Sequence, residues 1–172
     1  EIIVRVCHRA RFIVIQSEEL HFRLQDLLPE IGERLVFIPK SVVYLGQEDF
    51  HLREEAGCGP ENLLFFLPAG IRPVKGNLEC LRLMKKVHEQ RPRIRVLFAG
   101  APIDPEYSEK FEKEVAGLGA FARWIPPIPP PAILSAYRAA DIILNASSSE
   151  GLSNALLEAT AAGRPVLASK IP

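Results

Sequence analysis

The sequence predicts an α/β fold in which a parallel sheet is flanked by helices. Short apolar segments alternate with longer amphipathic segments, which is the pattern of βα units. The segment 63–67 is apolar at every position, as expected of a central parallel strand that is buried on both faces. A chain of 172 residues can bury a core of this kind. The predicted strands are residues 11–15, 35–38, 63–67, 95–99, 122–125, 142–144 and 166–168.

The predicted helices lie between these strands and carry their own start and stop signals. Ser17 is a suitable N-cap and two glutamates follow it in the first turn, while Pro29 stops this helix. Leu78, Leu81 and Met84 recur at a spacing that places them on one helix face, toward the core. The predicted helices are residues 18–28, 49–56, 78–88, 106–118, 132–140 and 154–162.

A proline-rich segment precedes the helix predicted at 132–140. Residues 126–131 contain five prolines in six positions. This composition is typical of a rigid loop that leads into the following helix. A polyproline ligand for a partner domain is the alternative interpretation.

Composition and charge exclude several classes of protein. Lys and Arg total 21, as do Asp and Glu, so the formal net charge is zero. The sequence therefore lacks the excess of basic residues that is typical of proteins that bind nucleic acid. No stretch reaches about 18 apolar residues, so we expect no transmembrane segment. The four histidines are dispersed without metal-ligand spacing, and we expect no metal site.

The cysteines and the chain ends bear on the cellular compartment. Cys7, Cys58 and Cys80 are isolated and lack CxxC spacing, which argues against a disulfide framework and favours a reducing compartment such as the cytoplasm. The chain starts at Glu1 without a methionine and ends on Pro172, so we expect both ends to be cut. The lack of a signal peptide therefore leaves the secretory pathway open.

The Ser-rich segment 147–154 stands at the start of the last predicted helix. Ser153 is a candidate N-cap. The unpaired N–H groups and the positive dipole end at a helix start can hold an anion such as a diphosphate. Gly151 would allow the backbone to come close to such a ligand.

Two glutamates flank this helix start. Glu158 lies five residues into the helix, about 7.5 Å along its axis, which matches the distance from a diphosphate to the ribose of a nucleotide. A carboxylate only accepts hydrogen bonds, so it can take both ribose hydroxyls. Glu150 precedes the turn, where a sugar would lie. The alternative is an ordinary capped helix with one loop carboxylate and one surface carboxylate.

Two further turns follow predicted strands, at the sheet edge where open α/β folds bind ligands. In the turn 69–76, Arg72 offers a planar fork for phosphate and Lys75 a point charge. The strand end 98–102 passes into a small-residue turn at Gly100, which suits close approach of a ligand. Each turn by itself is also typical of a common solvated βα loop.

In order and spacing, these motifs resemble the glycosyltransferase group 1 family, which contains retaining glycosyltransferases of the GT-B fold. Glu150 and Glu158 match the E-x7-E motif of these enzymes. The resemblance covers residues 34–172. Its other matching positions are Gly70, Arg72, Lys75 and Gly76 of a G-x-R…K-G signature, and the segments 98–100, 137–142 and 161–169.

The resemblance implies a fold and a division of the chain. The fold would be a Rossmann-like parallel sheet flanked by helices, the C-terminal, donor-binding half of a GT-B glycosyltransferase. Residues 1–48 would be the last βα piece of the N-terminal acceptor domain with the interdomain segment. Residues 49–172 would form the nucleotide-sugar-binding domain, truncated at its end.

The resemblance also implies roles for individual residues. Glu158 would bind the ribose, and Glu150 would contact the transferred sugar. Arg72 and Lys75 would neutralise the departing diphosphate, so these two and Glu150 are the expected catalytic residues. No metal or other cofactor is then required, because fixed cations and a helix N-terminus can stabilise the leaving group. The other expected donor-binding residues are Gly70, Gly100, Gly151, Leu152, Ser153 and Asn154, the last three through backbone N–H groups.

The expected function is transfer of a sugar, with retention, from a UDP-, GDP- or ADP-sugar. The acceptor is open: a glycan, a protein or a small molecule. This chain alone should bind a nucleotide weakly and transfer little, because positioning both substrates needs the acceptor domain. Two alternatives remain: a non-catalytic interaction protein on the same fold, and a sugar-nucleotide isomerase of the Rossmann type.

Overall fold

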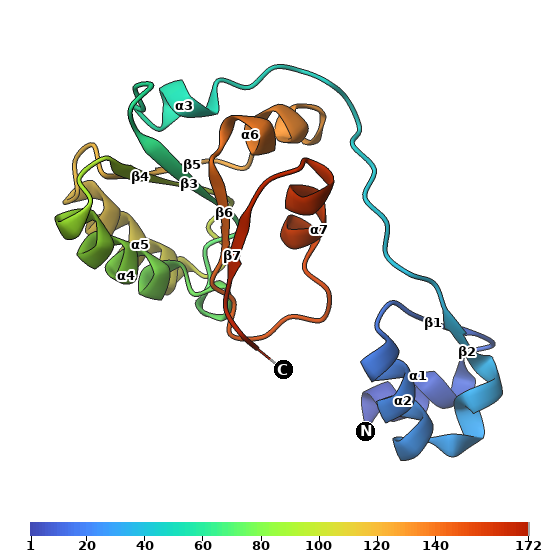
Figure 1. Ribbon diagram of the computed structural model, residues 1–172. Helices are drawn as coiled ribbons and strands as arrows, with labels where there is room; N and C mark the ends of the chain where they lie inside the picture. Colours follow the sequence, from blue (N-terminus) through green and yellow to red (C-terminus); the bar gives the residue numbers. More distant parts are fainter. Residues whose placement is uncertain (172) are drawn as a thin grey trace. The chain divides into compact units, whose positions relative to one another are not determined.

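The computed structural model describes residues 1–171, in which the chain forms two compact units, Glu1–Ser41 and Val42–Pro172 (Figure 1). Each unit has its own sheet; the first unit has one buried apolar cluster and the second has two. The assignment of residues 1–48 to the end of an acceptor domain stays a prediction.

The first unit is built around a two-stranded parallel sheet. Its elements are α1 (Ile2–Arg9), β1 (Ile13–Ile15), α2 (Glu18–Leu27), the 3₁₀ helix η1 (Pro29–Arg34) and β2 (Leu35–Phe37). Ser17 caps α2 as predicted, because its hydroxyl accepts a hydrogen bond from the Leu20 N–H at 3.4 Å. The sequence did not predict α1 or η1. Four of the eight residues of α1 are β-branched, a composition that favours strands.

The second unit contains a five-stranded parallel sheet with helices on both faces, which confirms the predicted α/β fold. Its strands are β3 (Leu63–Pro68), β4 (Ile94–Ala99), β5 (Ala122–Ile125), β6 (Ile142–Asn145) and β7 (Val166–Ala168). All five match the predicted segments to within one residue. Their order in the sheet is β5-β4-β3-β6-β7. The chain therefore changes direction between β3 and β6, which is a topological switch point.

Helices cover the two faces of this sheet in separate groups (Figure 1). They are α3 (Leu52–Glu55), α4 (Asn77–Gln90), α5 (Pro105–Ala116), α6 (Ile133–Ala139) and α7 (Asn154–Ala161), with the short 3₁₀ helices η2 (Pro73–Lys75) and η3 (Pro130–Ala132). Phe65 and Leu67 pack on the side of α4 and α5, whereas Leu64 and Phe66 pack on the side of α3, α6 and α7. Successive side chains of a strand point to opposite faces, so the all-apolar β3 joins both clusters.

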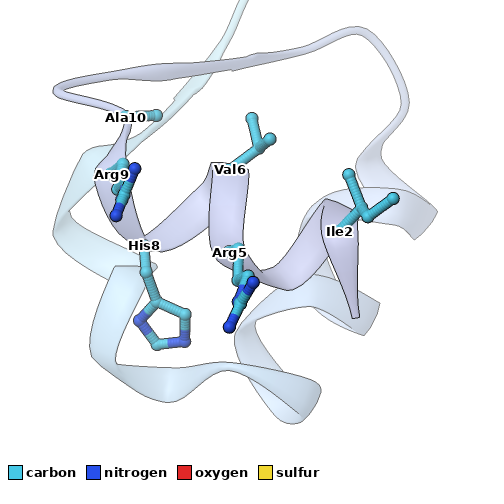
Figure 2. Close-up of a pocket in the computed structure, with 6 residues that line it drawn as sticks. All are labelled: Ile2, Arg5, Val6, His8, Arg9 and Ala10. Carbon is cyan, nitrogen blue, oxygen red and sulfur yellow. The ribbon is translucent and has the colours of Figure 1, made fainter.

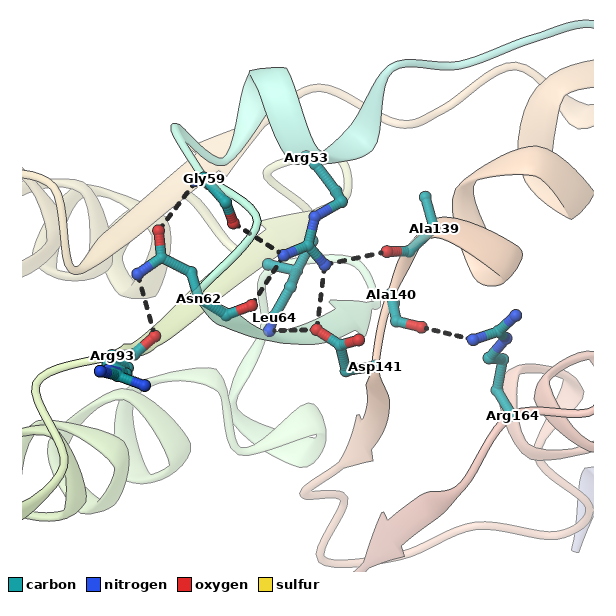
Figure 3. Close-up of polar contacts among 9 residues, drawn as sticks. All are labelled: Arg53, Gly59, Asn62, Leu64, Arg93, Ala139, Ala140, Asp141 and Arg164. Carbon is teal, nitrogen blue, oxygen red and sulfur yellow. Dashed lines mark hydrogen bonds and ion pairs between the residues drawn. The ribbon is translucent and has the colours of Figure 1, made fainter.

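The amino ends of β3 and β6 are held by a polar network centred on Arg53 (Figure 3). Its guanidinium donates to Asp141 Oδ2 at 3.0 Å and to the carbonyls of Gly59 and Asn62 at 3.0 and 2.7 Å. Asp141 Oδ2 also accepts from the Leu64 N–H at 2.7 Å. One arginine thus joins α3, the turn before β3 and the start of β6.

Removing this arginine is expected to destabilise the second unit. Arg53→Met removes the ion-pair partner of the half-buried Asp141 carboxylate and the donor to two carbonyl groups, so we expect the free energy of unfolding to fall by about 2–3 kcal/mol. Urea denaturation followed by circular dichroism measures this change. Arg82→Met is the control, since Arg82 pairs with Glu114 at the exposed surface. Equal losses in the two variants would show that the network adds no stability.

Candidate functional site

A cavity of about 360 Å³ lies at the carboxyl ends of β3 and β4, within the size range of small-ligand sites of about 300–1,000 Å³. Gly70, Gly100, Asn154 and Glu158 line it, and all four are predicted donor-binding residues. It also adjoins the switch point between β3 and β6, where open α/β sheets bind ligands. Its apolar lining includes Ala69, Ala99, Ile103, Ile128 and Ile133.

Two glycines shape the backbone beside this cavity. A Cβ atom on Gly100 would lie 2.1 Å from the carbonyl oxygen of Ala69, so the turns after β3 and β4 approach too closely for a side chain. A Cβ atom on Gly70 would lie 2.8 Å from Cγ1 of Ile103. Backbone atoms without side chains therefore form this part of the cavity. This agrees with the prediction that the turn at Gly100 leaves room for close approach of a ligand.

Glu158 reaches the cavity from α7 and is held by two tyrosines. The Tyr137 hydroxyl donates to Glu158 Oε2 at 2.8 Å, and the Tyr44 hydroxyl donates to the Glu158 backbone carbonyl at 2.5 Å. The helix ends three residues later, where Gly163 adopts a positive φ of 70°. The Gly163 N–H donates to the Thr160 carbonyl, which closes the end of the helix.

Ser153 occupies the N-cap position of α7, but its hydroxyl does not cap the helix. The hydroxyl accepts a hydrogen bond from Asn145 Nδ2 at 2.9 Å, which ties the helix start to the end of β6. Ser153 is therefore the N-cap residue, as predicted, without a hydrogen bond from its side chain to the helix. Within residues 1–171, no protein acceptor pairs with the N–H groups of Asn154 and Ala155. Gly151 and Leu152 lie exposed in the turn before them.

Lys75 and Glu150 form an ion pair that the sequence did not predict. Lys75 follows β3 and Glu150 follows β6, and these neighbouring strands bring Lys75 Nζ to 2.5 Å from Glu150 Oε1. Ser147 also donates to Glu150 Oε1, at 2.7 Å. Burial disfavours the charged carboxylate, but these hydrogen bonds outweigh it and hold the pKa of Glu150 below its usual value. Glu150 is thus an ionised partner that fixes the Lys75 ammonium.

Arg72 stands apart from this pair. Its side chain is exposed, and among the described residues its guanidinium has no hydrogen-bond or ion-pair partner. Its backbone N–H donates to Asn77 Oδ1 at 3.2 Å, which fixes the turn after β3. Arg72, Lys75 and Glu150 do not line the cavity that Glu158 enters. The structure therefore presents the predicted residues as two groups, one in the cavity and one in the loops after β3 and β6.

The pair between Lys75 and Glu150 is expected to make stability depend on pH. Because the pKa of Glu150 is lowered in the folded chain, its stabilising effect is complete above the ordinary carboxyl pKa of about 4.3 and is lost as pH falls through the lower folded value. The wild type should therefore lose stability in acid more steeply than Glu150→Gln. Urea titrations over a pH series measure both curves. Parallel curves would contradict the pairing.

The sequence missed several residues that support this site. Tyr137 falls within a matched family segment, yet its contact with Glu158 had no sequence signal. Tyr44 lies 114 positions before Glu158, so no local pattern could reveal their contact. The proline segment also contributes, because Pro127 lines the cavity and the Pro131 carbonyl accepts the Glu48 N–H.

A larger hollow lies in the first unit and holds none of the predicted residues. It has a volume of about 850 Å³ and runs along α1 (Figure 2). Its lining comes from one helix and its C-cap: Ile2, Arg5, Val6, His8, Arg9 and Ala10. A hollow beside a single helix lacks converging elements, so we do not assign it a ligand.

Two kinds of feature are absent from the described part of the chain. Residues 1–171 contain no group of three or more His, Cys, Asp or Glu side chains placed to hold a metal ion. Within the same residues, no helix combines the length and the apolar character needed to cross a membrane.

The fold is that of an α/β protein with a cavity beside the switch point of a parallel sheet. The family model of glycosyl transferases group 1 matches residues 50–172. The chain belongs to this glycosyltransferase family.

Sequence relatives agree with this assignment. Glycosyltransferase 1 domain-containing protein 1 of Xenopus tropicalis is 26% identical over 174 residues, which cover 97% of this chain and 50% of that protein. A D-inositol 3-phosphate glycosyltransferase of Corynebacterium urealyticum is 36% identical over 108 residues, covering 59% of this chain and 25% of the relative. The chain thus spans half or less of the length of these relatives.

Solved structures share the fold. Anabaena Alr3699/HepE in complex with UDP-glucose superposes with a TM-score of 0.78 at 16% identity, covering 99% of this chain and 48% of that one. Sucrose-phosphate synthase from Thermosynechococcus elongatus gives a TM-score of 0.76 at 19% identity, covering 97% of this chain and 42% of that one. The α/β architecture therefore matches that of GT-B glycosyltransferases.

Proposed function

We propose that this chain supplies the donor site of a glycosyltransferase that moves a sugar from a nucleoside-diphosphate sugar with retention of configuration. One observation carries the proposal: Glu158 lines a cavity at the carboxyl ends of β3 and β4, while at the start of its own helix the N–H groups of Asn154 and Ala155 have no protein acceptor within residues 1–171. A carboxylate and a helix N-terminus on one helix match the two ends of a nucleoside diphosphate.

The nucleoside would enter the cavity, with its ribose hydroxyls donating to Glu158. The diphosphate would then extend along α7 to the N–H groups of Leu152, Ser153 and Asn154. Gly151 supports this placement, since a Cβ atom there would meet nothing within 4 Å and its φ is not positive. The fold itself does not demand glycine at this position, whereas a ligand passing close to the backbone would.

The leaving diphosphate gains negative charge as the sugar departs. The guanidinium of Arg72, which has no partner among the residues that the structure describes, and the ammonium of Lys75 would stabilise that charge together with the positive end of α7. Lys75 is already oriented by Glu150, so little reorganisation is needed at the moment of reaction. Transfer would then proceed without a metal ion. Glu150 would also contact the transferred sugar.

The proposal also covers the base of the donor nucleotide, the acceptor and the role of the first unit. Structures with similar folds are described in complex with UDP-glucose and with UDP and GlcNAc, so UDP is the first nucleotide to test, ahead of GDP and ADP. The acceptor would be a glycan, a protein or a small molecule. Residues 1–48 would belong to the acceptor domain, and residues 49–172 to the donor domain.

Calorimetric titration of the 172-residue chain with UDP, GDP and ADP tests the donor site. We expect one of the three to bind with a Kd of about 1 mM or below. Arg72→Ala should weaken that binding about tenfold, because it removes a charged donor to the diphosphate. Lys113→Ala, on the exposed face of α5, is the matched control and should leave the Kd unchanged. Absence of binding by all three nucleotides would refute the donor site and favour a non-catalytic interaction protein.

A further inference from the structure

The carboxylate of Glu158 is held by a buried tyrosine of the neighbouring helix. The Tyr137 hydroxyl, on α6, donates to Glu158 Oε2 at 2.8 Å. Among the described residues, Glu158 Oε1 has no such donor. The two oxygens of one carboxylate therefore have different surroundings, one fixed by the protein and one left for another donor.

Tyr137 is itself rigidly placed. Its side chain is fully buried, and its ring meets the ring of Phe66 edge to face, with 5.9 Å between the ring centroids. Burial and the negative charge of Glu158 raise the pKa of Tyr137, so its phenol stays protonated and keeps its role as donor. A protonated phenol in a packed environment fixes the position of the oxygen that it contacts.

Glu158 is anchored through its backbone as well. The Tyr44 hydroxyl donates to its carbonyl at 2.5 Å, from the segment that precedes α3. A free glutamate side chain loses rotamer freedom when it binds a ligand, and that loss weakens binding. A carboxylate already fixed at Oε2 avoids most of this loss.

We propose that Tyr137 is a positioning residue for donor recognition: it fixes Glu158 Oε2 so that Oε1 remains directed to the ribose hydroxyls of a nucleoside diphosphate. This inference rests on the proposed function, because it requires that Glu158 binds the ribose. Tyr137 acts through Glu158 and need not touch the nucleotide.

The test compares UDP with 2′,3′-dideoxy-UDP, which lacks both ribose hydroxyls, by calorimetry on the full chain. The wild type should bind UDP at least about tenfold more tightly than the dideoxy nucleotide, because Glu158 accepts from the hydroxyls. Tyr137→Phe keeps the ring and removes only the phenol oxygen. It should weaken UDP binding about tenfold and leave dideoxy-UDP binding unchanged, so that the preference for the ribose hydroxyls falls by about the same factor.

Tyr107→Phe is the matched control. Tyr107 also donates to a glutamate, Glu79 Oε2 at 3.0 Å, but it lies outside the cavity. Its loss should leave the ratio of the two Kd values at the wild-type level even where it lowers stability. A Tyr137→Phe variant that keeps the wild-type ratio would overturn the positioning role. A wild type that binds both nucleotides equally would instead refute ribose binding by Glu158, and with it the proposed donor geometry.

Discussion

Replacing Gly76 by alanine is expected to lower the free energy of unfolding by about 3–5 kcal/mol and to separate Lys75 from Glu150. Gly76 has a φ of 61°, in the left-handed region, and a Cβ atom there would lie 2.2 Å from the Ala146 carbonyl oxygen. Two backbone segments touch at this point, the turn after β3 and the loop after β6. A methyl group therefore forces apart the loops that carry the ion pair.

Gly119→Ala separates the two causes of this loss of stability, which are backbone strain at a positive φ and the clash of a new Cβ atom with Ala146. Gly119 also has a positive φ, 55°, but a Cβ atom there would meet nothing within 4 Å. Its substitution should therefore lose only the conformational strain, about 1–2 kcal/mol. Urea denaturation of both variants gives the comparison. Equal losses would show that the two loops do not touch at Gly76 in solution.

Glu158→Ala is expected to weaken UDP binding about 30-fold, equivalent to about 2 kcal/mol, because hydrogen bonds to a charged acceptor are lost. The same substitution leaves the buried Tyr137 hydroxyl without its acceptor, so some loss of stability should accompany it. Calorimetric titration with UDP measures the affinity, and circular dichroism verifies that the variant is folded at the titration temperature.

Two further variants make this result specific to the carboxylate. Glu158→Gln keeps the size of the side chain and one acceptor oxygen, so its affinity for UDP should lie between those of the wild type and Glu158→Ala. Glu109→Ala removes an exposed carboxylate from α5, remote from the cavity, and should bind as the wild type does. If Glu158→Ala binds UDP as tightly as Glu109→Ala, Glu158 does not contact the ribose.

The fold of the second unit could be predicted because its signals are local. The all-apolar run of β3 and the helix periodicity of Leu78, Leu81 and Met84 each depend on residues close in sequence. The helix α1 was missed because its β-branched residues favour a strand, and tertiary packing around Cys7 overrides that preference.

The site could be predicted only at the level of its separate parts. The cavity gathers Gly70, Gly100, Asn154 and Glu158, as expected of strand ends in a parallel sheet. The pairing of Lys75 with Glu150 joins residues 75 positions apart and depends on β3 lying beside β6. That neighbourhood is a property of the sheet order, and sequence patterns alone did not reveal it.

The hydroxyl of Ser153 shows that a local sequence rule can predict where a helix starts without predicting which group a side chain binds. Serine before a helix predicts a side-chain cap. Here the hydroxyl accepts from Asn145 at the end of β6 instead. The local rule placed the helix start correctly, while a contact with the neighbouring strand determined what the hydroxyl binds.

Amide chemical shifts of the isotopically labelled chain, recorded during titration with UDP-glucose, test the donor site most directly. We expect saturable shifts for the amides of residues 151–155 at the start of α7, for Gly100 beside the cavity and for Lys75 in the turn after β3. Residues of α1, which lines the larger hollow of the first unit, should not shift. Shifts confined to α1, or no shift anywhere at millimolar UDP-glucose, would contradict the proposed donor site.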